Sequence, residues 1–201
     1  MNPVRNQKRQ KRKSQKLSIS KGVKKNYWFT EKTLPGVKPN SKFKIKVKKK
    51  ITSFKTPYQK GEILDTFEYG RILVLDGIIQ LTEKDELIYH EMITHLPLFH
   101  HPNPQKVLII VGGDGGVLRE VLKHPIQEVY LVEIDKKVIE ISKKYLPFVA
   151  RSSFRDKKAK IFIEDGIKFV KNYKDFFDVI IIDSTDPSGP SPVSYTHLTL
   201  P

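Results

Sequence analysis

Five carboxylates in the second half of the chain lie at or just after the end of a short apolar run. They are Asp114, Glu133, Asp165, Asp183 and Asp186. If the apolar runs are parallel strands, these acids meet at one edge of the sheet, where open α/β sheets bind ligands. Acids that face one another are costly unless cations lie between them. The pattern therefore predicts a cleft for cations, either metal ions or organic amines.

The first of these acids sits in a glycine-rich turn. An apolar run from Val107 to Val111 is followed by Gly-Gly-Asp-Gly-Gly over 112–116, and residues 117–123 have the apolar spacing of a helix. Strand, glycine turn and helix open a nucleotide-binding unit, in which glycines allow a tight turn and a close approach of backbone to ligand. Asp114 would repel a pyrophosphate at a helix N-terminus. The turn therefore favours a ligand that is uncharged or cationic at this point.

The remaining acids fit a nucleoside and an amine. Glu133 lies 19 residues after Asp114, where an acid accepts both ribose hydroxyls. Asp165 follows the third strand and can meet an adenine amino group. Asp183 and Asp186 could hold Mg²⁺, but the sequence has no phosphate-binding element to accompany them. The predicted cleft also has no Lys or Arg to balance its acids. An amine substrate together with a sulfonium nucleoside fits every acid at once.

Alternating elements must position these acids. We predict strands over 107–111, 128–133, 160–163 and 178–183, and helices over 117–123, 135–145 and 166–173. This alternation predicts a parallel sheet with helices on both faces, over a domain of residues 105–190.

Residues 26–82 have a different pattern, which predicts a small antiparallel β domain. Residues 42–48 alternate strictly, with Phe43, Ile45 and Val47 expected inward and a row of lysines in water. Further strands are expected near 61–67, 71–75 and 78–81, with a hairpin turn at Asp76-Gly77. A helix over 87–96 and a proline-rich linker then fill residues 83–104.

The composition narrows the classes of function. The net charge is +15, but residues 1–25 hold ten Lys or Arg and no acid, which leaves the remainder at +5. We expect a disordered basic extension there, either a solvated tail or an arm that binds polyanions. There is no cysteine and no apolar run near the ~20 residues of a membrane span. The spacing of His95, His100 and His101 does not favour a metal site.

Six separated motifs resemble the spermidine synthase family over about residues 26–190. They are LDGIIQ (75–80), DELIYHEM (85–92), HPNP (101–104), GGDGGVLRE (112–120), VEID (132–135) and IDSTDP (182–187). The resemblance implies a Rossmann-like sheet of the class I methyltransferase type behind a small antiparallel β domain. It also implies transfer of an aminopropyl group from decarboxylated S-adenosylmethionine to putrescine, giving spermidine and methylthioadenosine.

The resemblance also implies roles for individual residues. Asp183 would accept the proton of the attacking amine, and Tyr89 would assist it. The nucleoside would be held by Gln59, Asp114, Glu133, Asp165, Gly166 and Pro190. The polyamine would be held by His90, Asp114, Asp183, Asp186, Trp28 and Tyr69. The family implies no metal, no cofactor beyond the sulfonium co-substrate, a cytoplasmic homodimer or homotetramer, and no membrane; nucleic acid would bind only through residues 1–25.

The chain departs from the family at two places. Val111 stands where the family often has glycine, and we expect this change to cost little. After Pro190 the resemblance ends, and residues 191–201 contain no Lys, Arg, Asp or Glu. We therefore expect a non-native tail and a catalytic domain that is truncated at its C-terminus. The last strand would then be an open edge, and the chain as written would be poorly stable and inactive.

Three alternatives stay open. A related transferase with another polyamine acceptor, or a class I methyltransferase, would use the same sheet. An inactive relative would keep the motifs without turnover. A basic nucleic-acid-binding protein would depend on residues 1–25 alone.

Overall fold

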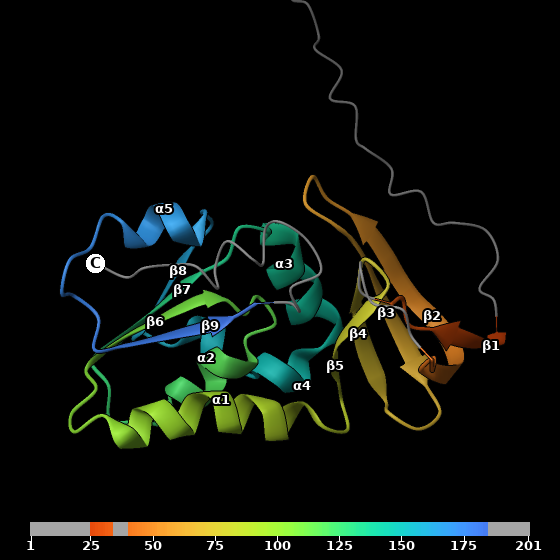
Figure 1. Ribbon diagram of the computed structural model, residues 1–201, viewed down its shortest axis with the longest axis horizontal. Coiled ribbons are helices and arrows are strands. Elements are labelled where there is room, and N and C mark those ends of the chain that lie inside the picture. Colours follow the sequence, from red (N-terminus) through yellow and green to blue (C-terminus); the bar gives the residue numbers. More distant parts are fainter. Residues whose placement is uncertain (1–24, 34–39, 185–201) are drawn as a thin grey trace, which may run out of the picture.

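The computed structural model describes residues 25–33 and 40–184, which form two sheets (Figure 1). The first is antiparallel, in the order β1-β2-β3-β4-β5. The second is parallel, in the order β8-β7-β6-β9. The predicted fold class, a Rossmann-like parallel sheet behind a small antiparallel β domain, is therefore confirmed.

The antiparallel sheet follows from the alternation of its residues. Its strands are β1 (Lys25–Thr30), β2 (Lys44–Lys55), β3 (Lys60–Thr66), β4 (Arg71–Leu75) and β5 (Ile78–Thr82). In the first half of β2, Ile45 and Val47 are buried while the lysines between them are exposed. Register shifts after Val47 and Lys50 end this alternation in the second half of the strand. The prediction for Phe43 was wrong: it precedes β2, is 48% exposed and lies edge-on to Tyr69.

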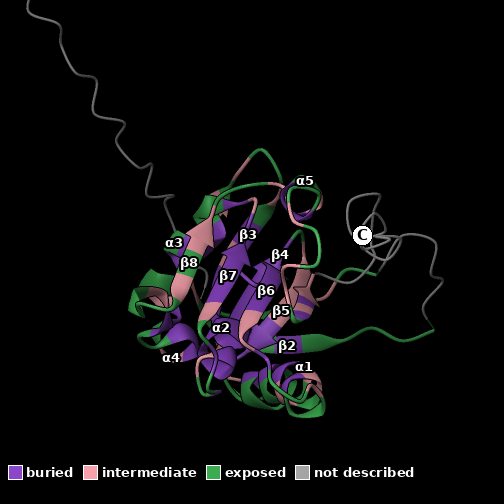
Figure 2. Ribbon diagram, turned by 90° about the vertical axis from the view of Figure 1, so that its left-hand side faces the viewer, coloured by how far each residue is buried: buried purple, intermediate pink, exposed green. Residues whose placement is uncertain are grey.

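The parallel sheet has two central strands, β6 and β7, that are buried on both faces, while its outer strands β8 and β9 are only partly buried (Figure 2). The strands are β6 (Lys106–Val111), β7 (Glu128–Val132), β8 (Ala159–Phe162) and β9 (Val179–Asp183). The helices are α1 (Glu86–His100), α2 (Gly116–Val121), α3 (Lys136–Tyr145), α4 (Pro147–Ala150) and α5 (Gly166–Val170), with a 3₁₀ turn at Ser153–Arg155. Near-continuous Val, Leu and Ile are what a strand covered on both faces requires.

Apolar clusters cover the two faces of the parallel sheet and join it to the other sheet. Leu98 of α1 and Val117 of α2 pack on one face with Ile109. Phe169 of α5 packs on the other face with Leu108 and Tyr130. A third cluster joins the sheets, because α3 and α4 contribute Ile141, Leu146 and Val149 to a core with Ile63, Leu73, Leu75 and Leu81.

Helix α1 presents two contrasting faces. Its buried residues are Glu86, His90, Thr94 and Leu98, so a polar stripe faces inward. Large apolar side chains face outward: Ile88, Met92, Leu96 and Phe99 are between 54% and 78% exposed. None of the helices among the described residues combines the length and apolar character that crossing a membrane would need.

Two features of the strand ends bear on the site. Among the described residues β9 pairs with β6 alone, at the end of the sheet order. Val111, at the end of β6, has φ +69°, the left-handed region that glycine favours. A β-branched residue is strained there, so the expectation that valine costs little at this position was wrong.

Candidate active site

A cleft opens where the carboxyl ends of β6, β7 and β9 meet the antiparallel sheet. Its volume is about 570 Å³, including space that is open to solvent. The acids Asp114, Glu133 and Asp183 line it. The antiparallel sheet contributes Gln59 and Gln80, and α1 contributes Tyr89 and His90. The structure thus gathers six of the residues expected from the sequence, and adds Gln80.

Asp183 ends β9 beside Val111 of β6. Its Oδ1 accepts a hydrogen bond from the Tyr89 hydroxyl at 2.8 Å. Its Oδ2 is shielded from solvent, and no described residue donates to it. Burial, together with the nearby Asp114 carboxylate, raises the pKa of Asp183 to about 7. A carboxyl with a pKa near neutrality and one free oxygen is suited to accept a proton at physiological pH.

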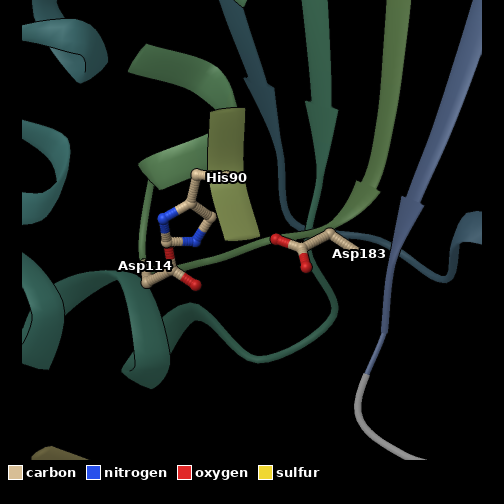
Figure 3. A group of neighbouring side chains, drawn as sticks. All are labelled: His90, Asp114 and Asp183. Atoms are coloured by element: carbon tan, nitrogen blue, oxygen red, sulfur yellow. The ribbon is translucent and has the colours of Figure 1, made fainter. Parts of the chain in front are cut away.

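His90 is buried between the carboxylates of Glu86 and Asp114, and Figure 3 shows it beside Asp114 and Asp183. Its Nε2 is 3.4 Å from Asp114 Oδ1, and its Nδ1 is 2.6 Å from Glu86 Oε2. Burial alone would lower the pKa of His90, but the two carboxylates raise it to about 10. Burial alone would likewise raise the pKa of Asp114, but His90 and the backbone N–H of Gly116 bring it below its ordinary value. The pair is therefore ionised near neutral pH.

No Lys or Arg lines the cleft among the residues that the structure describes. The cationic partner of the acids is His90, and behind it Arg119 of α2 is buried against Glu86. His90 meets Asp114, and Arg119 meets Glu86, across long stretches of sequence, so these two pairings depend on how α1, α2 and the glycine turn pack. The acid cluster thus contains part of its own neutralising charge.

The glycines of the turn make room for side chains of the site itself. A β-carbon on Gly116 would lie 2.2 Å from the His90 ring, and one on Gly113 would lie 2.8 Å from Glu133 Oε2. Gly112 has φ +77°, and a β-carbon there would lie 3.0 Å from Asp183 Oδ2. The sequence analysis attributed the glycines to the turn and to ligand approach; the structure adds that the site's own side chains occupy the space.

Glu133 is held from both ends of its carboxylate. Its Oε2 accepts from Gly113 N at 3.1 Å, and its Oε1 accepts from Asp135 N at 2.8 Å. Burial raises the pKa of Glu133 to about 7, although these backbone N–H groups oppose the change. Asp135 caps α3 as expected, by accepting from Lys137 N. Its other oxygen accepts from Gln59 Nε2 at 3.0 Å and from the Thr56 hydroxyl at 2.8 Å, so it links the two sheets.

Several expected site residues lie elsewhere or outside the described residues. Asp165 and Gly166 follow β8 at the same sheet edge but do not line the cleft, and Asp165 Oδ1 caps α5. Trp28 is 62% exposed on β1. Tyr69 lies beyond the end of β3 opposite to Gln59, so neither aromatic reaches the cleft within this chain. Asp186 and Pro190 lie outside the described residues.

One group of described residues could hold a cation. Single ligand atoms of His90, Asp114 and Asp183 lie within 4.8 Å of one another. A metal would need a nitrogen lone pair from His90, yet both of its ring nitrogens face carboxylates, which favours protonation of both. The arrangement therefore suits an organic ammonium, to which the two acids offer oxygens, better than a metal ion.

Comparison with known families agrees with this geometry. The family model described as "Spermine/spermidine synthase domain" matches residues 86–200, more than half of the chain. The chain belongs to this family. A second model, "Spermidine synthase tetramerisation domain", matches residues 27–83, which include nearly all of the antiparallel sheet.

Individual relatives in the spermine/spermidine synthase family are close in sequence. A polyamine aminopropyltransferase of Thermoanaerobacter sp. (strain X514) is 54% identical over 165 residues, which are 82% of this chain and 58% of the relative. One from Clostridium tetani is 53% identical over 145 residues, which are 72% of this chain and 52% of the relative. The chain thus spans a little over half the length of these relatives.

Solved spermidine synthases share the fold. The structure of one in complex with the transition state analogue AdoDATO has a TM-score of 0.77 and 43% identity, over 87% of this chain and 59% of that one. The enzyme from Thermotoga maritima has a TM-score of 0.75 and 42% identity, over 86% and 60% of the two chains. The family match continues to residue 200, so it includes most of the segment 191–201 that was expected to be unrelated.

Proposed function

We propose that this protein is a spermidine synthase, which transfers the aminopropyl group of decarboxylated S-adenosylmethionine to putrescine. The observation that carries the proposal is the environment of Asp183 at the C-terminal end of β9. Its Oδ1 accepts a hydrogen bond from Tyr89, its Oδ2 has no donor among the described residues, and its pKa is about 7. The relatives named polyamine aminopropyltransferase support it.

The proposed reaction is a displacement at carbon. The putrescine nitrogen forms a bond to the methylene carbon beside the sulfonium, and the bond from that carbon to sulfur breaks. Methylthioadenosine leaves with the electron pair on sulfur, which neutralises the sulfonium. Asp183 takes the proton of the amine, because an ammonium has no lone pair with which to attack.

The other residues would position the two substrates. Glu133 is placed to accept the ribose hydroxyls, and Gln59 approaches from the antiparallel sheet. Asp114 and His90 would hold an amino group at the opposite side of Asp183. Holding two reactants in line supplies much of the acceleration in a displacement of this kind. Since a sulfonium is already a good leaving group, we propose no further cofactor.

The remaining expected contacts stay proposals. Asp165 with Gly166 would meet the adenine, Pro190 would adjoin it, and Asp186 would bind the amine chain. The family model named for tetramerisation supports a homo-oligomer built through residues 27–83, and we place the enzyme in the cytoplasm. Size-exclusion chromatography with light scattering would show a monomer if the assembly proposal is wrong.

The test is an assay of methylthioadenosine release from decarboxylated S-adenosylmethionine with and without putrescine. In a version completed to the length of the relatives, we expect release that depends on putrescine and is nearly abolished in Asp183→Asn, while nucleoside binding persists. Spermidine and longer diamines offered as acceptors would show whether another polyamine is preferred. Transfer of a methyl group from S-adenosylmethionine, or no turnover with binding of neither substrate, would overturn the proposal.

A further inference from the structure

We propose that Glu86, clamped by Arg119, is a positioning residue that keeps His90 as a fixed imidazolium against Asp114. His90 then acts as a permanent positive charge of the amine site and leaves proton acceptance to Asp183. This inference rests on the proposed function for its role in turnover, but the state of His90 can be measured without any turnover.

Two hydrogen bonds join the Arg119 guanidinium to the Glu86 carboxylate. Arg119 Nη1 donates to Glu86 Oε1 and Nη2 donates to Oε2, both at 3.0 Å. A bidentate guanidinium fixes the plane of the carboxylate as well as its position. The same Oε2 lies 2.6 Å from His90 Nδ1, one helical turn along α1. The Glu86 and Arg119 side chains are only 4% and 5% exposed, so water does not compete for these bonds.

Arg119 is itself anchored by two further groups. Its Nε donates to Glu120 Oε1 at 2.6 Å, and its Nη1 also bonds to the Val149 carbonyl. The clamp therefore fastens α1 to α2 and α4. The His90 ring also lies so close to the backbone of Gly116 that a β-carbon there would be only 2.2 Å from it.

The charge of His90 follows from what faces it on each side. Glu86 lies on its own helix, Asp114 in the glycine turn and Asp183 at the end of β9; Tyr89 packs edge-on beside it. Each ring nitrogen is directed at a carboxylate, and only the doubly protonated ring donates to both. Three carboxylates around one imidazole outweigh its burial.

A fixed imidazolium changes what the cluster of acids can do. It neutralises one of the two charges that Asp114 and Asp183 would carry together, and it offers no basic nitrogen to the attacking amine. Asp114 is thereby held ionised as an ammonium anchor. Asp183, which has no such partner on Oδ2, is left as the proton acceptor. Glu86 touches neither substrate, so its effect passes entirely through His90.

The test uses the full chain with ¹⁵N-labelled histidine and two-bond ¹H–¹⁵N correlation spectra, recorded from pH 6 to 10. The His90 signals are assigned by their loss in His90→Asn. In the wild type both ring nitrogens should remain protonated through about pH 9. In Glu86→Gln the titration midpoint should fall by at least about one pH unit, because one of the facing carboxylates is gone.

The matched control is Glu120→Gln. This variant removes a carboxylate charge that pairs with the same Arg119, at its Nε, and Glu120 does not contact His90. It should destabilise the fold comparably and leave the titration of His90 unchanged. If Glu86→Gln does not fold, the double variant Glu86→Gln with Arg119→Gln, which buries no unpaired charge, replaces it and should show the same fall.

Two outcomes would overturn the inference: a neutral His90 tautomer in the wild type near pH 7, or an unchanged midpoint in the folded Glu86 variant. Where turnover is measurable, kcat/KM in Glu86→Gln should fall at a pH above the lowered His90 midpoint, where the imidazole is neutral and Asp114 loses its cation, and should change little near pH 7. Absence of turnover in the wild type would count against the proposed function alone, because the spectra do not depend on it.

Discussion

The two sheets of this protein use the same charged residue types to opposite effect. In the antiparallel sheet, carboxylates lie at the surface beside lysines: Asp65 is 3.9 Å from Lys48, and Glu62 pairs with Lys50. At the carboxyl edge of the parallel sheet, Asp114, Glu133 and Asp183 gather with little access to water, and two of them have their pKa raised to about 7. The difference teaches that burial and crowding, not residue type, make an acid available for chemistry.

The largest contrast between the sheets should appear in Asp183→Asn. The amide cannot accept a proton, so kcat should fall by about 10²–10⁴-fold. The same change removes a shielded carboxylate that is ionised at pH 8, so Tm there should rise by about 2–4 °C. Asp65→Asn in the antiparallel sheet is the control and should alter neither quantity appreciably. Full turnover in Asp183→Asn would contradict the assignment of Asp183 as the proton acceptor.

Glu133→Gln should act on binding more than on chemistry. Loss of hydrogen bonds from ribose hydroxyls to a charged group should raise the KM for the nucleoside by about 10–100-fold. Glu62→Gln, which removes a surface partner of Lys50, should leave it within about twofold. Isothermal titration with methylthioadenosine would measure the change directly; equal affinities of both variants would show that Glu133 does not hold the nucleoside.

The pH dependence of stability should have one sign for Asp183 and Glu133 of the site and the opposite sign for Glu68, a surface acid in the turn between β3 and β4. For Asp183 and Glu133 the folded pKa of about 7 exceeds the ordinary values of 3.8 and 4.5. Their contribution to the free energy of unfolding is therefore present in full below about pH 4 and lost as pH rises toward 7. Glu68, whose pKa is lowered by Lys84, contributes above pH 4.5 and loses that contribution as pH falls.

Thermal unfolding followed by circular dichroism from pH 4 to 8 would separate these effects. The double variant Asp183→Asn with Glu133→Gln should lose less stability than the wild type as pH rises through that window. Glu68→Gln should leave the slope above pH 5 as it is. Parallel curves for the wild type and the double variant would show that these two acids titrate normally.

The smallest expected effect concerns the strained end of β6. Because Val111 has φ +69°, Val111→Gly should be more stable than Val111→Ala by about 1 kcal/mol. At Val132, which ends the neighbouring β7 with an ordinary backbone angle, alanine should be better than glycine by a similar amount. Urea unfolding of the four variants gives the comparison, and a preference for alanine at both positions would contradict it.

Much of this arrangement could be predicted from local pattern. Strict alternation in the first half of β2 and continuous apolar runs in β6 and β7 are short-range signals, and they fixed the two sheet types. The acids Asp114, Glu133 and Asp183 could be placed because strand ends converge in any parallel sheet. That rule depends on order along the chain and needs no knowledge of tertiary contacts.

What could not be predicted depends on contacts between distant elements. The apolar residues of α1 occupy more than one side of the helix, so its sequence did not show that His90 and Glu86 face inward. Arg119 meets Glu86 across 33 positions, through the packing of α2 on α1. The strain at Val111 and the exposure of Phe43 likewise arise where a strand ends, which is where pattern is least informative.

The outward face of α1 has a consequence for how the protein behaves at high concentration. This face is an exposed apolar stripe on a molecule whose net charge is +15, and it consists of Ile88, Met92, Leu96 and Phe99. In dilute salt, repulsion between like-charged molecules keeps such stripes apart; at a physiological ionic strength that repulsion reaches only about 8 Å. Ionic strength, rather than temperature, should therefore govern the colloidal stability of this chain, and the helix that shelters His90 sets that limit.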